Sequence, residues 1–253
     1  MEKFFVKEDS IVRRIWGSSD TILFIFAGAS AEFALNKAVD WLYFTGRLPS
    51  DPIGRLFTTV RYAKQIVFAR EEDAIKAIEQ INQIHHHVEK SRGEKIPDWA
   101  YRDVLFMLIH YSIAAFNLLE RPLKEAEKEE VFSVFYRMGK AMQIKDLPEN
   151  FEHWRVKRLE HLKADLEKGA FSIDLYKEYR KHLGSFRFLL LKEVQKKLVP
   201  DHVSRLLSFQ RFSLLALALE PYKVAKKIGF GSFIIDLLVP QAYRKEVRQL
   251  ETS

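Results

Sequence analysis

Three consecutive histidines in a helix-like stretch are the first residues whose type and spacing could do chemistry. In residues 71–88, apolar side chains recur at the spacing of one helical face. His85 lies on that face, one turn after Ile81, whereas His86 and His87 rotate to the polar side. An imidazole that points into a protein interior needs a hydrogen bond, a metal or a cofactor as its partner. A core histidine held by a hydrogen bond is therefore the alternative to a ligand.

A second helix-like stretch, residues 52–69, carries a polar set of its own. Arg55, Thr59, Tyr62 and Ile66 recur along one side, opposite the ordinary apolar stripe of this stretch. Such a side is either exposed to solvent or the wall of a pocket. In a pocket wall, the permanently charged guanidinium would bind an anion and the hydroxyl would form a hydrogen bond.

Three motifs follow one another along the chain. They are Arg55-Leu56-Phe57-Thr58-Thr59 after an Asp-Pro helix start, Ile84-His85-His86-His87-Val88, and Trp99-Ala100-Tyr101-Arg102-Asp103 leading into Leu108-Ile109-His110. In order and approximate spacing, these motifs resemble the catalytic domain shared by latex-clearing rubber oxygenases and the membrane-bound oxygenase of mycophenolic acid biosynthesis. The resemblance covers about residues 20–170, and the ordered set of motifs is more specific than any one of them.

This resemblance implies a helical, globin-like core that holds non-covalent haem b and uses O₂ as co-substrate. It implies that His85 is the proximal iron ligand and that Arg55 is a cofactor-binding residue. Arg55, Thr59 and His110 are then the candidate catalytic residues of the pocket, with no specific role assigned to His110. The implied reaction is oxidative cleavage of a carbon–carbon double bond in a hydrophobic substrate.

The chain departs from the rubber-cleaving members at one position. Those members place a lysine between the arginine and the threonine, where this chain has Thr58. An amine ligand from that position, and rubber as substrate, are therefore not expected. Two carboxylates in the apolar stretch upstream, Glu32 and Asp40, are candidates for a catalytic base, and the alternative for each is a cap or an ion pair with Arg55.

The elements that must position these residues are helices throughout. Helix-start and helix-stop signals predict helices over about 20–45, 52–69, 71–91, 97–120, 125–142 and 148–169, followed by shorter ones over 172–183, 186–198 and 201–219. Strand-like alternation is weak everywhere. We therefore expect an all-α protein with one domain over residues 1–253, made of an oxygenase-like core (20–170) and a C-terminal helical cap (171–253).

Composition narrows the chemistry further. The chain of 253 residues has no cysteine, which excludes disulfides, thiolate metal sites and covalent attachment of haem. The N-terminus lacks the apolar region of a signal peptide, and no run of about 18 uncharged apolar residues predicts a membrane span. We expect a cytoplasmic location and leave membrane association open.

Positive charge is concentrated in one segment. Residues 180–227 contain eleven Lys and Arg against three Asp and Glu, whereas the whole chain has a net charge of +7. These helices either pack on the core with charged outer faces or dock peripherally on an anionic membrane. No nucleic-acid-binding motif accompanies the charge, so nucleic acid is not an expected partner.

The family resemblance, together with the inward-facing His85, implies a haem b-dependent oxygenase that cleaves or oxygenates a hydrophobic unsaturated small molecule, such as a terpenoid or a lipid. The alternative is a non-catalytic helical protein that binds haem or lipid and docks at membranes. The sequence does not predict an oligomeric state.

Overall fold

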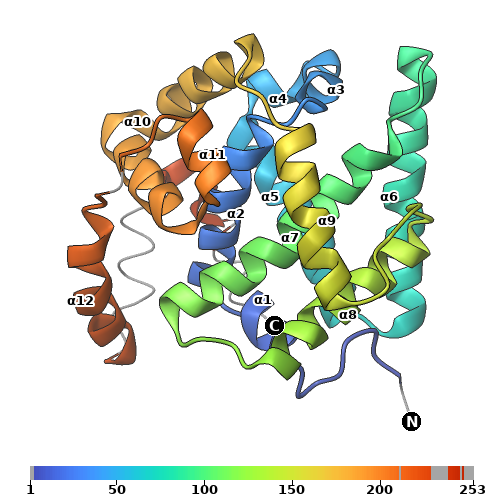
Figure 1. Cartoon of the computed structure of the whole chain (residues 1–253), viewed down its shortest axis with the longest axis horizontal. Coiled ribbons are helices and arrows are strands. Elements are labelled where there is room, and N and C mark those ends of the chain that lie inside the picture. The colour runs from blue at the N-terminus through green and yellow to red at the C-terminus, as the bar shows by residue number, and fades with distance from the viewer. Residues whose placement is uncertain (1–2, 211, 229–238, 246, 248–253) are drawn as a thin grey trace.

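The described part of the protein is all-α, as predicted (Figure 1). A computed structural model describes residues 3–210, 212–228, 239–245 and 247. Within these residues no sheet forms, and extended pairing is limited to two isolated bridges. Arg211 of the basic segment, and residues 229–238, 246 and 248–253 of the expected C-terminal cap, lie outside the described residues. The globin-like arrangement stays a prediction.

Helices make up most of the described residues. Their bounds are α1 Ile11–Trp16, α2 Ser19–Phe33, α3 Val39–Phe44, α4 Arg47–Ser50, α5 Pro52–Phe68, α6 Glu71–Arg92, α7 Asp98–Leu119, α8 Glu125–Ala141, α9 Phe151–Ala164, α10 Ala170–Leu198, α11 Asp201–Leu206, α12 Leu215–Lys227 and the 3₁₀ turn η1 Gln241–Tyr243.

The two helices that carry the candidate residues begin and end where local sequence signals place them. The Asp51 side chain accepts a hydrogen bond from the backbone N–H of Gly54 at 2.8 Å, and Pro52 occupies the first turn of α5. Helix α6 ends at Arg92 and is capped by Gly93, whose φ of 77° is a left-handed conformation that suits glycine. These boundaries fix the register of Arg55 and His85 along the chain.

The predicted helix over 20–45 is interrupted in the structure. Helix α2 stops at Phe33 and α3 starts at Val39, with Asn36 between them. The Asn36 side chain accepts a hydrogen bond from the N–H of Ala38 at 2.9 Å and donates one to Asp103 at 2.6 Å. Because Asp103 lies on α7, a distant partner sets this break, and local pattern could not predict it.

Helices α2 and α7 pack closely at the centre of the molecule. A Cβ atom on Gly28 would lie 2.3 Å from a ring carbon of Tyr111, so only the absence of a side chain lets the helices approach this far. Among the described helices, α7 is long and apolar enough to cross a membrane by length and composition alone, and most of it is buried against its neighbours.

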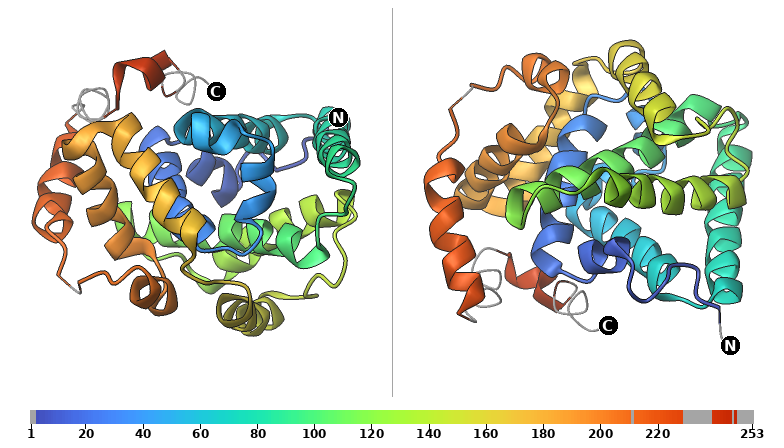
Figure 2. Two further views of the ribbon diagram at one scale, coloured as in Figure 1. Left: turned by 90° about the horizontal axis from the view of Figure 1, so that it is seen from above. Right: turned by 60° about the horizontal axis from the view of Figure 1, so that its bottom comes forward.

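The C-terminal helices form the end of the molecule opposite α6 (Figures 1 and 2). The two helices predicted over 172–183 and 186–198 run together as α10 across a kink at Gly184, where φ is 74°. Helix α12 is fixed to the core because Lys226 binds both Asp20 and Glu120 at 2.7 Å. At least one positive charge of this segment therefore forms ion pairs with the rest of the protein.

Candidate functional site

A mainly apolar cavity of about 290 Å³ lies among α2, α3, α5, α6 and α7. Its volume lies just below the range for small-molecule sites, roughly 300–1,000 Å³. Phe26, Phe33, Trp41, Ile81 and Met107 are among its apolar lining residues. Water is poorly accommodated by such walls, so the few polar groups that line the cavity determine its chemistry.

His85 enters this cavity from α6. His86 and His87 are exposed on the other side of the helix, as the helical spacing predicts. Nδ1 of His85 is enclosed and has no hydrogen-bond partner among the described residues. The ring packs edge-on against Tyr101, with centroids 5.1 Å apart.

The electrostatic surroundings keep the His85 imidazole neutral. Burial and the nearby Arg55 guanidinium lower the pKa of His85 from 6.5 to about 4, against a smaller opposing effect of Glu89. Glu89 itself accepts hydrogen bonds from the N–H of Ile96 at 3.0 Å and from the Tyr101 hydroxyl at 3.3 Å. A neutral imidazole with an enclosed, unpartnered nitrogen is the form that a metal ion binds.

Helix α5 supplies several of the polar side chains of the wall. Arg55, Thr58, Thr59 and Tyr62 all line the cavity. The Thr58 hydroxyl donates to the Gly54 carbonyl at 3.0 Å, and the Thr59 hydroxyl donates to the Arg55 carbonyl at 3.3 Å. Each hydroxyl hydrogen is therefore engaged by the helix, which leaves the oxygen as an acceptor. Arg55 is the permanent positive charge of the site.

His110, the fourth candidate, does not line this cavity. It donates a hydrogen bond to the Leu198 carbonyl, and its Nε2 is enclosed without a partner among the described residues. Burial, followed by Arg158, lowers its pKa to about 4. The structure thus brings His85, Arg55 and Thr59 together and leaves His110 apart, so a catalytic role for His110 stays a prediction.

The two carboxylates proposed as catalytic bases are engaged by arginines other than Arg55. Glu32 is 1% exposed and forms a two-pronged ion pair with Arg158, and it also accepts a hydrogen bond from the Tyr111 hydroxyl at 2.9 Å. Asp40 binds Arg92 at 2.8 Å. These contacts account for both carboxylates as structural ion pairs.

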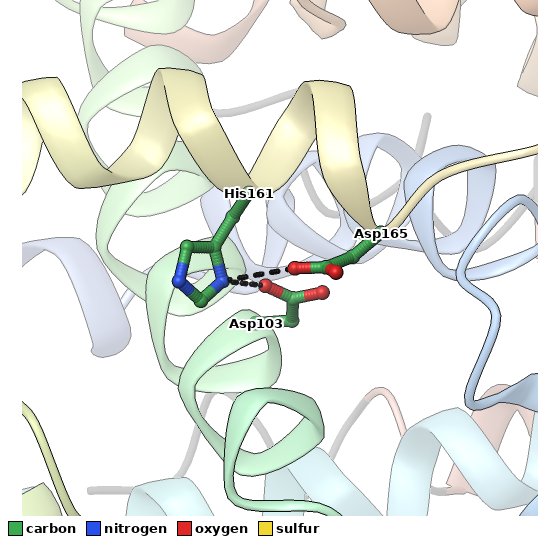
Figure 3. A group of neighbouring side chains, drawn as sticks. All are labelled: Asp103, His161 and Asp165. Atoms are coloured by element: carbon green, nitrogen blue, oxygen red, sulfur yellow. Dashed lines mark hydrogen bonds and ion pairs between the residues drawn. The ribbon is translucent and has the colours of Figure 1, made fainter.

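A second group of possible metal ligands was not predicted as a site. Asp103, His161 and Asp165 offer ligand atoms that all lie within 4.8 Å of one another (Figure 3). His161 Nδ1 lies 2.5 Å from Asp103 and 3.2 Å from Asp165, and burial together with Asp103 raises the pKa of Asp165. Hydrogen bonding within the group accounts for this arrangement.

This cluster lies directly behind the wall of the cavity. Asn36 lines the cavity and also donates its hydrogen bond to Asp103. The sequence contains two separate parts of this cluster. Asp103 ends the Trp99–Asp103 motif, and His161 and Asp165 are one helical turn apart, but nothing in the sequence links the two parts. Only the packing of α9 on α7 brings the two parts together.

A comparison with known families agrees with the motifs. The family model described as "ER-bound oxygenase mpaB/B'/Rubber oxygenase, catalytic domain" matches residues 13–244, which is most of the chain. No curated protein matches the chain.

Proposed function

The chain belongs to the family of ER-bound oxygenase and rubber oxygenase catalytic domains, and on that premise we propose that it is a haem b-dependent oxygenase. We propose a hydrophobic unsaturated small molecule, terpenoid or lipid-like, as the substrate. The observation that carries this proposal is the neutral His85 imidazole, with its enclosed and unpartnered Nδ1, beside Arg55 in an apolar cavity.

The residues of the cavity suit haem. His85 would hold the iron, because a neutral imidazole has a lone pair to donate. Arg55 would bind a propionate, since a guanidinium and a carboxylate form paired, charge-assisted hydrogen bonds. When bound, haem supplies an iron centre for chemistry with dioxygen. Cleavage of a C=C bond by one O₂ into two carbonyl groups balances without an external reductant.

The protein's own contribution would be binding and exclusion of water. The apolar walls would hold the substrate's hydrocarbon chain within the cavity and keep bulk water out of it. The Thr59 hydroxyl oxygen can accept a hydrogen bond from a substrate hydroxyl or a bound water and so orient it. The Thr59 hydroxyl hydrogen is already donated to the Arg55 carbonyl, and Thr59 could donate to a ligand only by breaking that hydrogen bond. Arg55 also keeps His85 unprotonated by electrostatic repulsion.

An absorption spectrum tests this proposal. We expect the purified protein, with or without added haemin, to show a Soret band that His85→Ala abolishes or shifts. His86→Ala is the matched control, because His86 is the exposed neighbour on the same helix. A protein that gives no Soret change with haemin, and in which His85→Ala behaves like the wild type, would rule the proposal out. O₂ consumption with unsaturated terpenoids and lipids then tests catalysis.

The competing candidate, a non-catalytic haem- or lipid-binding protein that docks at membranes through 180–227, has one supporting observation. Phe186, Leu217 and Ile228 are 72%, 70% and 68% exposed in this basic segment. Flotation with anionic vesicles tests the docking part, with Leu217→Ser as the variant. Charge reversal of Lys226 is unsuitable, because this lysine binds Asp20 and Glu120 within the fold. Haem binding without turnover of any unsaturated substrate would favour this candidate.

A further inference from the structure

The half of α6 that carries His85 is held less by packing than the half before it. The buried residues of α6 all precede Ile81. From Ile81 to Arg92 every residue is half-buried or exposed, and several of these residues line the cavity. Helix α6 stands at one side of the molecule (Figure 1). The position of His85 therefore depends on a small number of specific contacts.

One ring contact touches the His85 imidazole directly. Tyr101 of α7 lines the same cavity, and its ring lies edge-on to His85, with centroids 5.1 Å apart and planes at 63°. Edge-on contact is a favoured geometry for two aromatic rings. Nδ1 of His85 has no hydrogen-bond partner among the described residues, so no bond at this nitrogen fixes the imidazole. The Tyr101 ring is therefore placed to restrict its rotation.

The Tyr101 ring is itself anchored to α6. Its hydroxyl donates to Glu89 Oε1 at 3.3 Å, and Glu89 lies one helical turn after His85. Burial, followed by the Glu89 carboxylate, raises the pKa of Tyr101, so the hydroxyl keeps the hydrogen that it donates. The same Glu89 oxygen accepts the N–H of Ile96, in the connection to α7, at 3.0 Å. His85, Tyr101 and Glu89 thus form a closed set of contacts between the two helices.

We infer that Tyr101 is the positioning residue of His85: its ring fixes the orientation of the imidazole, and Glu89 holds that ring through the hydroxyl. The imidazole is then oriented by packing, where a ligand histidine is usually oriented by a hydrogen bond of its own. The consequence for a cofactor rests on the proposed function, in which His85 holds the haem iron. The orientation itself can be measured without a cofactor.

Nuclear magnetic resonance relaxation of histidine labelled with ¹³C at Cε1 tests the positioning on the full chain without haemin. His85→Ala assigns the signal. We expect an order parameter of about 0.85 for the His85 ring in the wild type and below about 0.6 in Tyr101→Leu. Tyr101→Phe keeps the ring, loses the bond to Glu89 and should give an intermediate value. Wild-type ring order in Tyr101→Leu or Tyr101→Phe, with the variant folded by circular dichroism, overturns the inference.

Two control variants separate positioning from charge and from general loosening of the cavity. Glu89→Gln removes the charge but keeps an amide oxygen that can accept both hydrogen bonds. Tyr62→Leu removes a tyrosine that lines the same cavity from α5 and, among the described residues, makes no ring contact with His85. Both variants should keep the His85 ring order of the wild type. A loss of order in either control as large as that in Tyr101→Leu overturns the inference.

The protein loaded with haemin gives a second readout. Electron paramagnetic resonance of the ferric iron depends on the orientation of its imidazole ligand. We expect one signal in the wild type and several overlapping signals in Tyr101→Leu. Haemin affinity of Tyr101→Leu should also fall by at least about tenfold, as is typical when a residue that orients a metal ligand is removed. The same single signal and the same affinity in both proteins contradict the inference.

The outcomes also distinguish this inference from the proposed function. If haemin binds through His85 while the ring order is unchanged in Tyr101→Leu, the inference fails and the oxygenase proposal stands. If the ring order falls in Tyr101→Leu while the wild type takes up no haemin, the positioning of His85 by Tyr101 stands and the oxygenase proposal fails.

Discussion

His85 on α6 and His110 on α7 are alike in their local chemistry and opposite in their surroundings. Both are partly buried, both have a pKa lowered to about 4, and both have one enclosed ring nitrogen without a partner among the described residues. His85 faces a cavity of about 290 Å³, whereas His110 does not line it and lies near the Glu32–Arg158 ion pair. A neutral buried imidazole therefore does not identify a binding site by itself; the open space next to it does.

The neighbours of the two histidines explain what each region contributes. Around His85, apolar walls leave room that a ligand can fill. Around His110, the charges of Glu32 and Arg158 neutralise each other in a packed interior, where the loss of one partner is expensive. Substitutions near His110 should therefore act on folding, and those near His85 should act on binding.

The largest expected effect is on the His110 side. Glu32→Gln leaves the Arg158 guanidinium buried without its counter-charge, and we expect the free energy of unfolding to fall by about 3–5 kcal/mol. Urea denaturation measures this loss. Asp40→Asn, which weakens the more exposed pair with Arg92, is the control and should change stability little. A fall of less than about 1 kcal/mol for Glu32→Gln would contradict a packed, charge-compensated interior.

Acid should affect the two regions alike. Because the native pKa of each histidine is about 4 instead of 6.5, the unfolded chain binds protons between these values while the native protein does not. The contribution of each histidine to the free energy of unfolding is therefore fully present above pH 6.5. It is lost as the pH drops from 6.5 towards 4, and the loss is at most about 3 kcal/mol for each histidine. Urea denaturation at pH 7 and pH 4.5 should show this fall reduced in His85→Leu and in His110→Leu. The exposed His86→Leu is the control, and an equal fall in all variants would refute this assignment.

The same two variants should diverge at pH 7. His110→Leu leaves the Leu198 carbonyl without its donor, and we expect a loss of about 2 kcal/mol in the free energy of unfolding. His85→Leu places an apolar side chain at a cavity that is already apolar, so its stability should stay within about 1 kcal/mol while haemin binding is lost. Urea denaturation measures the change in stability, and the Soret band measures haemin binding. A His85→Leu variant that is less stable than His110→Leu would contradict the expected difference between the two regions.

The smallest expected effect concerns α3, which we expect to act as a cover over one side of the His85 cavity because Trp41 and Leu42 line it. Arg92 at the end of α6 binds Asp40 and lies 4.0 Å over the ring of Trp41, which lines the cavity. Arg92→Met should lower stability by only about 1 kcal/mol or less. It should nevertheless speed the transfer of haemin to apomyoglobin severalfold, because α3 is held less firmly. Arg92→Lys keeps the charge and should behave more like the wild type, and equal transfer rates in all three proteins would argue against α3 as a cover.

Local sequence signals predicted the elements of the site well. Asp51 and Pro52 set the start of α5, Gly93 ended α6, and helical spacing turned His85 inward. Spacing along two neighbouring helices, together with the family resemblance, was enough to place Arg55, Thr59 and His85 on one cavity.

Contacts between distant residues were beyond the reach of those signals. Glu32 and Arg158 are 126 positions apart, so nothing in either local sequence indicates the pair. The break at Asn36 depends on Asp103, which lies on another helix. Charge counting left two alternatives for the basic segment, packed helices with charged outer faces or a membrane-docking surface, and it could not show that Lys226 binds Asp20 and Glu120 within the fold.

The contact between Gly28 and Tyr111 has a consequence for how this chain can vary. Even a methyl group at position 28 would push the Tyr111 ring, and with it the hydroxyl that binds Glu32. In a library of all single substitutions, position 28 should therefore tolerate as few residues as any position in the cavity, although it carries no chemical group. Descendants of this sequence could gain a side chain there only after Tyr111 had been replaced by a smaller residue, so the order in which the two mutations arise is fixed by their geometry.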